Sequence, residues 1–165
     1  MKLKRLTKNA LLTGLALIIF VIELQLPALS PVPGLKLGLS NIITVYAVFA
    51  LSPADAAMIL TARILLGTFI SGNMSALMYS AAGGTLCWLA MLLLRKMLTS
   101  RQIWIASVIG AIFHNLGQVL VAIAITKTPA LIAYLPILTA GGMLAGLFTG
   151  LSSQYMINHM NKIGK

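Results

Sequence analysis

The sequence predicts an all-α integral membrane protein, with six transmembrane helices in a compact bundle and both termini in the cytoplasm. Three observations support this fold class. Of the 165 residues, 59% are hydrophobic and 8% are charged, whereas soluble domains carry about 25% charged residues. The apolar residues form long runs, as a bilayer crossing of about 20 residues requires. The cations gather in the connections that would share one side of the membrane.

Six apolar runs, separated by turn-forming residues, are the expected spans of a single membrane domain over residues 1–165. They cover about 9–26, 37–51, 54–70, 74–94, 103–126 and 131–157. Pro27 and Pro53 follow the first two runs, and proline cannot extend a helix. The turn-forming sequence Ser-Gly-Asn at 71–73 separates the third run from the fourth. Pro136 indicates an irregular start to the sixth.

The cation distribution sets the orientation. Six spans place both termini on one side, which then carries nine cations: Lys2, Lys4, Arg5, Lys8, Arg95, Lys96, Arg101, Lys162 and Lys165. The other side carries Lys36 and Lys127. Cytoplasmic connections hold the excess of Lys and Arg. We therefore expect a multi-pass protein of the cell membrane with both termini on the cytoplasmic side. The basic start followed by an apolar run also fits a signal peptide, but its cleavage pattern is poor and a retained helix is favoured.

The net charge of +10 raises the alternative of nucleic-acid binding. That function needs cations gathered on a solvated face with aromatic residues among them. Here the cations stand in short clusters between apolar runs, so the lipid bilayer is the expected environment and no nucleic acid is expected as a partner. Cys87 lies in an apolar run and is expected to be a small buried residue.

Small residues spaced four apart predict close helix contacts, because helices in lipid associate through close packing. Gly142, Gly146 and Gly150 occupy one face of the sixth span and are expected to pack within the bundle. Ala10 and Gly14 share a face of the first span near the cytoplasmic surface. For this pair, packing within the bundle and docking of a partner protein are equally favoured.

Rare polar residues at membrane depth are candidates for a functional site, since an ionisable group in hydrocarbon is costly unless it is paired or faces an interior. The candidates for substrate binding are Glu23, Lys36, Asn41, Arg63, His114, Asn115 and Gln118. The last three share one helix face. A structural role is the alternative: Glu23 would pair with Arg63 or Lys36, while His114 and Gln118 would bond backbone carbonyls. Their concentration towards the outer half favours a pocket open to the outside.

Several chemistries have no basis in the sequence. With two acidic residues, Glu23 and Asp55, paired acidic magnesium sites for diphosphate chemistry are excluded. No Cys/His spacing indicates a metal site, and no phosphate loop or dinucleotide fingerprint occurs. We therefore expect no catalytic residues, no metal, no cofactor and no enzymatic activity.

Two segments carry a resemblance to a known family. PVPGLKLGLSN at 31–41 and GAIFHNLGQ at 110–118 resemble the signatures of the Gx transporter family, also labelled heptaprenyl diphosphate synthase component I. The resemblance covers essentially the whole chain. Ser40 is a mild departure, because the family usually has alanine there.

This family is similar to the substrate-binding S components of energy-coupling factor transporters. The resemblance implies a membrane subunit that captures a small vitamin-like or quinone/isoprenoid-like molecule from outside. Its partners would be a membrane coupling subunit, docking at Ala10 and Gly14, and cytosolic ATPases in trans. The alternative is a non-catalytic membrane subunit associated with a prenyl (heptaprenyl) diphosphate synthase. A passive channel ranks last, since it would need polarity through the full membrane depth.

Overall fold

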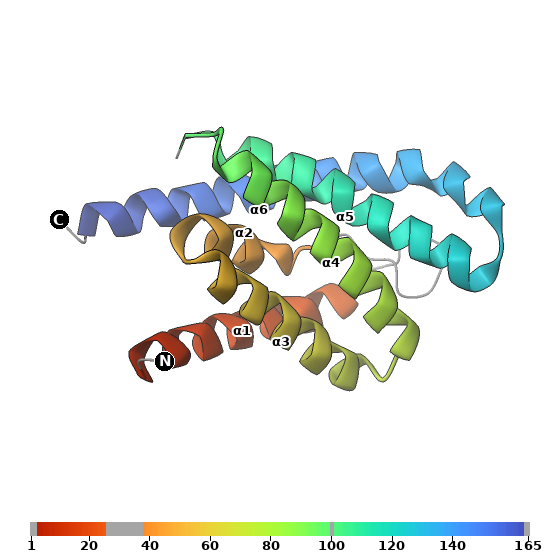
Figure 1. Cartoon of the computed structure of the whole chain (residues 1–165), viewed down its shortest axis with the longest axis horizontal. Coiled ribbons are helices and arrows are strands. Elements are labelled where there is room, and N and C mark those ends of the chain that lie inside the picture. The colour runs from red at the N-terminus through yellow and green to blue at the C-terminus, as the bar shows by residue number, and fades with distance from the viewer. Residues whose placement is uncertain (1–2, 26–37, 100, 164–165) are drawn as a thin grey trace.

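The computed structural model describes residues 3–25, 38–99 and 101–163, and these residues form helices and the turns between them. In chain order the helices are α1 (Leu3–Leu24), α2 (Asn41–Ala50), α3 (Pro53–Ser71), α4 (Met74–Arg95), α5 (Ile103–Thr126), the 3-10 helix η1 (Pro129–Tyr134) and α6 (Leu135–Ile163). Five of these segments are long and apolar enough to cross a membrane, with η1 and α6 counted as one. The helices pack as one elongated bundle (Figure 1), so the predicted all-α membrane fold is confirmed.

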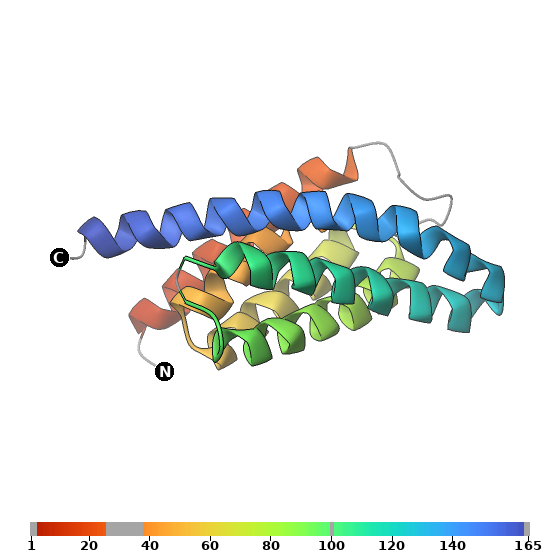
Figure 2. The same ribbon diagram turned by 90° about the horizontal axis from the view of Figure 1, so that it is seen from above.

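The start of α1 and the end of α6 lie at the same end of the bundle, together with the α2–α3 and α4–α5 connections (Figures 1 and 2). We call this the basic end, because it carries Lys4, Lys8, Arg95 and Lys162. The α3–α4 turn and the α5–η1 connection lie at the opposite end. The cations that the sequence analysis expects on the cytoplasmic side therefore lie, where the structure describes them, together at the basic end.

The second expected span is shorter than the sequence suggested. Helix α2 begins at Asn41 rather than near 37, and its ten residues rise about 15 Å, about half of a hydrocarbon core about 30 Å thick. A turn precedes it, in which Gly38 has φ +79°, a conformation that continues no helix. The N terminus of α2 consequently lies inside the bundle.

Local sequence explains the ends of the neighbouring helices. Ser52 caps α3 by accepting a hydrogen bond from the Asp55 amide, and Pro53 takes the first helical position, where its missing N–H is harmless. Gly72, with φ +62°, ends α3, and the Asn73 side chain caps α4. The turn predicted at 71–73 is thus present. The sixth expected span begins as η1 and continues as α6, with Pro136 in the first turn of α6.

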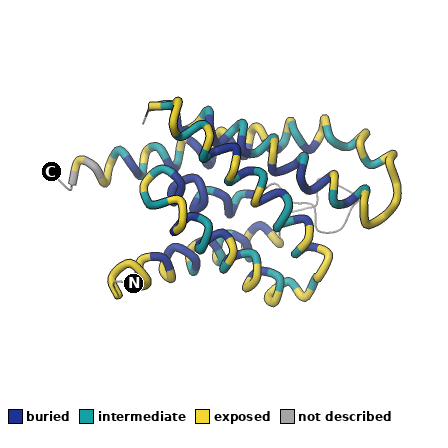
Figure 3. The backbone as a smooth tube through the Cα atoms, in the orientation of Figure 1, coloured by how far each residue is buried: buried dark blue, intermediate teal, exposed yellow. Residues whose placement is uncertain are grey.

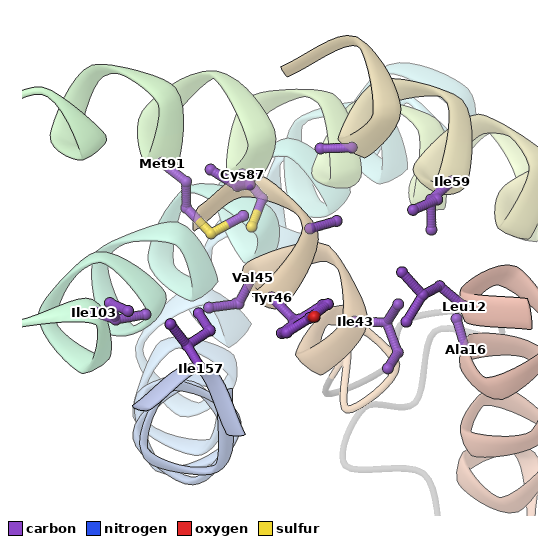
Figure 4. Close-up of a cluster of buried hydrophobic side chains, with 13 residues drawn as sticks. Leu12, Ala16, Ile43, Val45, Tyr46, Ile59, Cys87, Met91, Ile103 and Ile157 are labelled. Atoms are coloured by element: carbon purple, nitrogen blue, oxygen red, sulfur yellow. The ribbon is translucent and has the colours of Figure 1, made fainter. Parts of the chain in front are cut away.

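The core surrounds α2, which is buried on nearly every side, whereas the outer helices alternate buried and exposed positions (Figure 3). Val45, Tyr46 and Ile43 of α2 meet residues of α1, α4 and α6 (Figure 4). Large apolar side chains such as Phe69, Leu93 and Phe148 are exposed on the outside. This is the pattern of helices whose outer faces contact lipid.

A buried polar cluster as the candidate functional site

Glu23, at the end of α1, binds the turn that precedes α2. Its carboxylate accepts hydrogen bonds from the backbone amides of Gly38, at Oε1, and Ser40, at Oε2 over 3.4 Å. The side chain is buried. Free amides and the positive end of a helix dipole stabilise an anion at a helix N terminus. Glu23 therefore acts as an internal anion for α2.

Arg63, from the middle of α3, reaches the same turn from another side. Its Nη1 donates to Ser40 Oγ, and its Nη2 donates to Asn41 Oδ1 over 3.1 Å. Among the described residues the one ion pair within 4 Å joins Arg5 and Asp55. The alternative that Glu23 pairs directly with Arg63 is therefore wrong: the two opposite charges meet through residues 38–41 of the turn. Their attraction still acts across it.

His114, from α5, completes the cluster at Asn41 and Gly38. Asn41 Nδ2 lies 3.5 Å from His114 Nδ1, a weak contact at the outer limit of hydrogen bonding. A Cβ atom at Gly38 would lie 2.7 Å from Asn41 Nδ2 and 3.3 Å from His114 Nε2. Gly38 is thus required both by its positive φ and by the close approach of these side chains. Here "polar cluster" denotes Glu23, Gly38, Ser40, Asn41, Arg63 and His114.

Asn115 and Gln118 lie near the polar cluster but turn to other helices. Asn115 Nδ2 donates to the backbone carbonyl of Leu138 at the start of α6. Gln118 is 1% exposed, its Cγ lies against Gly83 of α4, and its Oε1 has no hydrogen-bond partner among the described residues. One helix face thus serves several neighbours: His114 contacts α4 as well as the start of α2, Asn115 contacts α6, and Gln118 contacts α4. The seventh substrate-binding candidate, Lys36, lies outside the described residues.

The two groups of small residues differ in their surroundings. Cβ atoms at Gly142, Gly146 and Gly150 would lie 2.1, 2.9 and 2.6 Å from atoms of Asn115, Ala111 and Trp104, so this glycine face is pressed against α5. Ala10 is exposed, and a Cβ atom at Gly14 would meet no atom within 4 Å. The Ala10–Gly14 face of α1 therefore has no packing partner among the described residues.

The described residues enclose a small space beside the polar cluster. This cavity of about 10 Å³ is lined in part by Gly38, Asn41, Ser107 and Thr149. That volume suits about one water molecule. Among the described residues, no three His, Cys, Asp or Glu side chains gather as a metal site.

Sequence reasoning missed two features of the polar groups. Ser40 supplies both an amide for Glu23 and a hydroxyl for Arg63; its departure from the alanine of the resembled family was the available signal. Asp55 lies in the first turn of α3, where its carboxylate complements the start of that helix. It also accepts hydrogen bonds from Arg5 Nε and Asn9 Nδ2, both 2.7 Å long, and so ties α1 to α3.

The sequence was compared with known protein families, curated proteins and solved structures. Residues 12–156 match the family described as heptaprenyl diphosphate synthase component I. No curated protein and no solved structure matches the chain significantly. The match covers most of the chain, including every residue of the polar cluster. The chain belongs to the heptaprenyl diphosphate synthase component I family.

Proposed function

We propose that this chain is the substrate-binding membrane subunit, similar to an S component, of an energy-coupling factor type uptake transporter. Its substrate would be a small vitamin-like or quinone/isoprenoid-like organic molecule. The observation that carries the proposal is the polar cluster itself. Four helices contribute polar side chains to one buried point inside an otherwise apolar bundle, and such groups are retained in membranes chiefly where they serve a function.

The hydrogen bonding of the cluster supports a role in binding rather than in stability alone. Arg63 is buried, yet its Nε has no partner among the described residues, and Gln118 Oε1 nearby on α5 is likewise unpartnered. An unsatisfied buried polar atom costs about 1–3 kcal/mol. A substrate with a polar or anionic end would recover part of that cost by accepting from Arg63. Its apolar body would then lie among the surrounding aliphatic side chains.

Transport requires a partner, because the sequence holds no nucleotide-binding motif. The exposed Ala10–Gly14 face supports docking of a membrane coupling subunit, since small residues let helix backbones approach closely. Cytosolic ATPases would act in trans through that subunit. The excess of cations at the basic end supports a location in the cell membrane with the basic end on the cytoplasmic side.

The binding role is tested by native mass spectrometry of the complex extracted from membranes. The wild-type chain is expected to retain an organic molecule that Asn41→Ala and His114→Ala lose. Ser153→Ala is the matched control, because it removes a part-buried hydrogen bond to α2, from Ser153 Oγ to the Ile42 carbonyl, that no residue of the polar cluster makes. Equal retention by all four proteins, or no ligand in any of them, would contradict substrate binding at this site.

Docking is tested with Gly14→Leu. The added side chain meets open space in the isolated subunit, so its thermal stability is expected to stay unchanged while co-purification of a coupling subunit and ATPases falls. Phe148→Leu, a change of shape on the exposed face of α6, is the control. A coupling complex that survives Gly14→Leu would show that α1 docks nothing through this face.

The family description favours a second candidate, a non-catalytic membrane subunit associated with a prenyl (heptaprenyl) diphosphate synthase. A synthase active site of its own is not supported by two acidic residues in 165. The same co-purification separates the candidates. Recovery of a prenyl synthase catalytic subunit without ATPases would favour the second, and recovery of ATPases the first.

A further inference from the structure

A groove separates α1 from α6 at the basic end, and no residue of the polar cluster lines it. These two helices do not pack against each other over their described lengths, and α2 lies between them. Figure 4 shows Tyr46 and Ile43 of α2 directed into the space between α1 and α6. The groove has a volume of about 530 Å³, with Leu11 and Met156 on its walls and Tyr46 at its base.

A second hollow of about 460 Å³ adjoins the groove. The two share Lys8, Tyr46 and Met160, and the second extends to Phe49 and Arg95. Tyr46 Oη donates to Met160 Sδ over 3.1 Å and so joins α2 to α6 beneath both hollows. The two adjoining hollows, together called the depression, are apolar along the helices and cationic at one end.

The cations of this depression lack acidic partners. Lys4, Lys8 and Arg95 line it, and no acidic side chain does. Asp55, the acidic residue described at this end, is already engaged by Arg5, Asn9 and Ser52. Helices α2 and α4 end nearby, and each C terminus carries about half a negative charge. Those two ends offset about one of the three positive charges, which leaves the depression attractive to an anion.

We propose that this depression binds an anionic phospholipid of the surrounding leaflet. Its phosphate would accept hydrogen bonds from Lys8 and Arg95, and an acyl chain would lie along Leu11 and Met156 above Tyr46. Basic pockets between membrane helices bind anionic headgroups in this way. A free anion would leave the apolar groove unfilled, and a neutral lipid would leave the cations unpaired. The phospholipid site is separate from the polar cluster and does not depend on the function proposed for that cluster.

The test uses native mass spectrometry of the full chain, stripped of lipid and titrated with phosphatidylglycerol, phosphatidylcholine or inorganic phosphate. The wild-type chain is expected to bind phosphatidylglycerol more tightly than either other probe. Each cation near an anionic membrane surface is worth about a fivefold change in affinity. Lys8→Gln with Arg95→Gln is thus expected to weaken phosphatidylglycerol binding about 25-fold.

Two further variants separate a defined site from general attraction. Lys162→Gln with Arg101→Gln removes the same charge from exposed positions that do not line the depression, and should change affinity less than about twofold. Thr7→Trp fills the groove from its exposed rim without changing charge, and should weaken the lipid but not inorganic phosphate. Equal losses in both charge variants, or equal binding of phosphatidylcholine, would overturn the proposal. So would tight binding of a co-purifying protein at the groove that lipid cannot displace.

Discussion

The two acidic residues of the chain occupy the starts of two helices in very different surroundings. Asp55 lies in the first turn of its own helix and forms a direct ion pair with Arg5, whose side chain is 48% exposed. Glu23 reaches the start of α2 from another helix, is buried, and balances Arg63 only through an intervening turn. The comparison shows two roles for a carboxylate. Asp55 joins two helices at the basic end, and Glu23 holds the buried turn around which the polar cluster forms.

The largest expected effect follows from Glu23→Gln. The substitution removes the charge from the group that binds the Gly38 and Ser40 amides and that lies opposite Arg63 across the turn. Hydrogen bonds to a charged group contribute about 1.5–3 kcal/mol each, so two of them predict a loss of about 3–5 kcal/mol. Unfolding in bicelles measures this loss. The double variant with Arg63→Gln should lose less than the sum of the single variants, because the two charges interact. Strict additivity would show that the turn insulates Glu23 from Arg63.

Gly38→Ala is expected to have an intermediate effect, because it adds a clash to an unfavourable φ. Gly72→Ala is the matched control: its φ is +62° against +79° for Gly38, but an added Cβ meets nothing within 4 Å. A left-handed backbone costs about 1 kcal/mol for a non-glycine residue, and the contacts with Asn41 and His114 should add about 1–3 kcal/mol at Gly38 alone. Equal losses of unfolding free energy would mean that the cluster adapts to the added methyl group.

Asp55→Asn is expected to have the smallest effect on the midpoint of thermal unfolding. Solvent and salt screen the partly exposed pair with Arg5, so the difference from wild type should shrink as salt is raised from low to molar concentration. The Glu23→Gln difference should persist in high salt, because buried charges are screened less. A salt-independent Asp55→Asn effect would indicate that Asn9 and Ser52, rather than the charge of Arg5, dominate at this end.

The sequence predicted much of the fold from length and composition. The runs at 54–70, 74–94 and 103–126 are helices within a residue or so of their expected bounds, because proline, glycine and asparagine mark their ends locally. The run at 37–51 was overestimated. Its uncharged residues suit lipid and a protein interior equally, so hydropathy alone did not reveal that α2 is short and buried among other helices.

The candidate site was predicted residue by residue but not in its contacts. Buried ionisable groups stand out in an apolar sequence, so Glu23, Arg63 and His114 could be selected. Their partners could not be predicted. Glu23 bonds the backbone amides of residues 38 and 40, and because nearly every residue has a backbone amide, the sequence does not show which amides a carboxylate will bind. The importance of Ser40 also appeared only when its hydroxyl was found beside Arg63.

Composition and the lengths of the apolar runs are enough to predict a bundle of apolar helices with its cations at one end. A bilayer requires long uncharged segments whose backbone hydrogen bonds are satisfied within the helix, and such segments are visible in the sequence. Only the packing of the helices places the start of α2 in the interior, brings Glu23 to the amides of the turn before α2, and joins Arg63 and His114 there. Those contacts join residues up to 76 positions apart between Gly38 and His114. Such distances are closed by helix packing, which local sequence patterns do not specify.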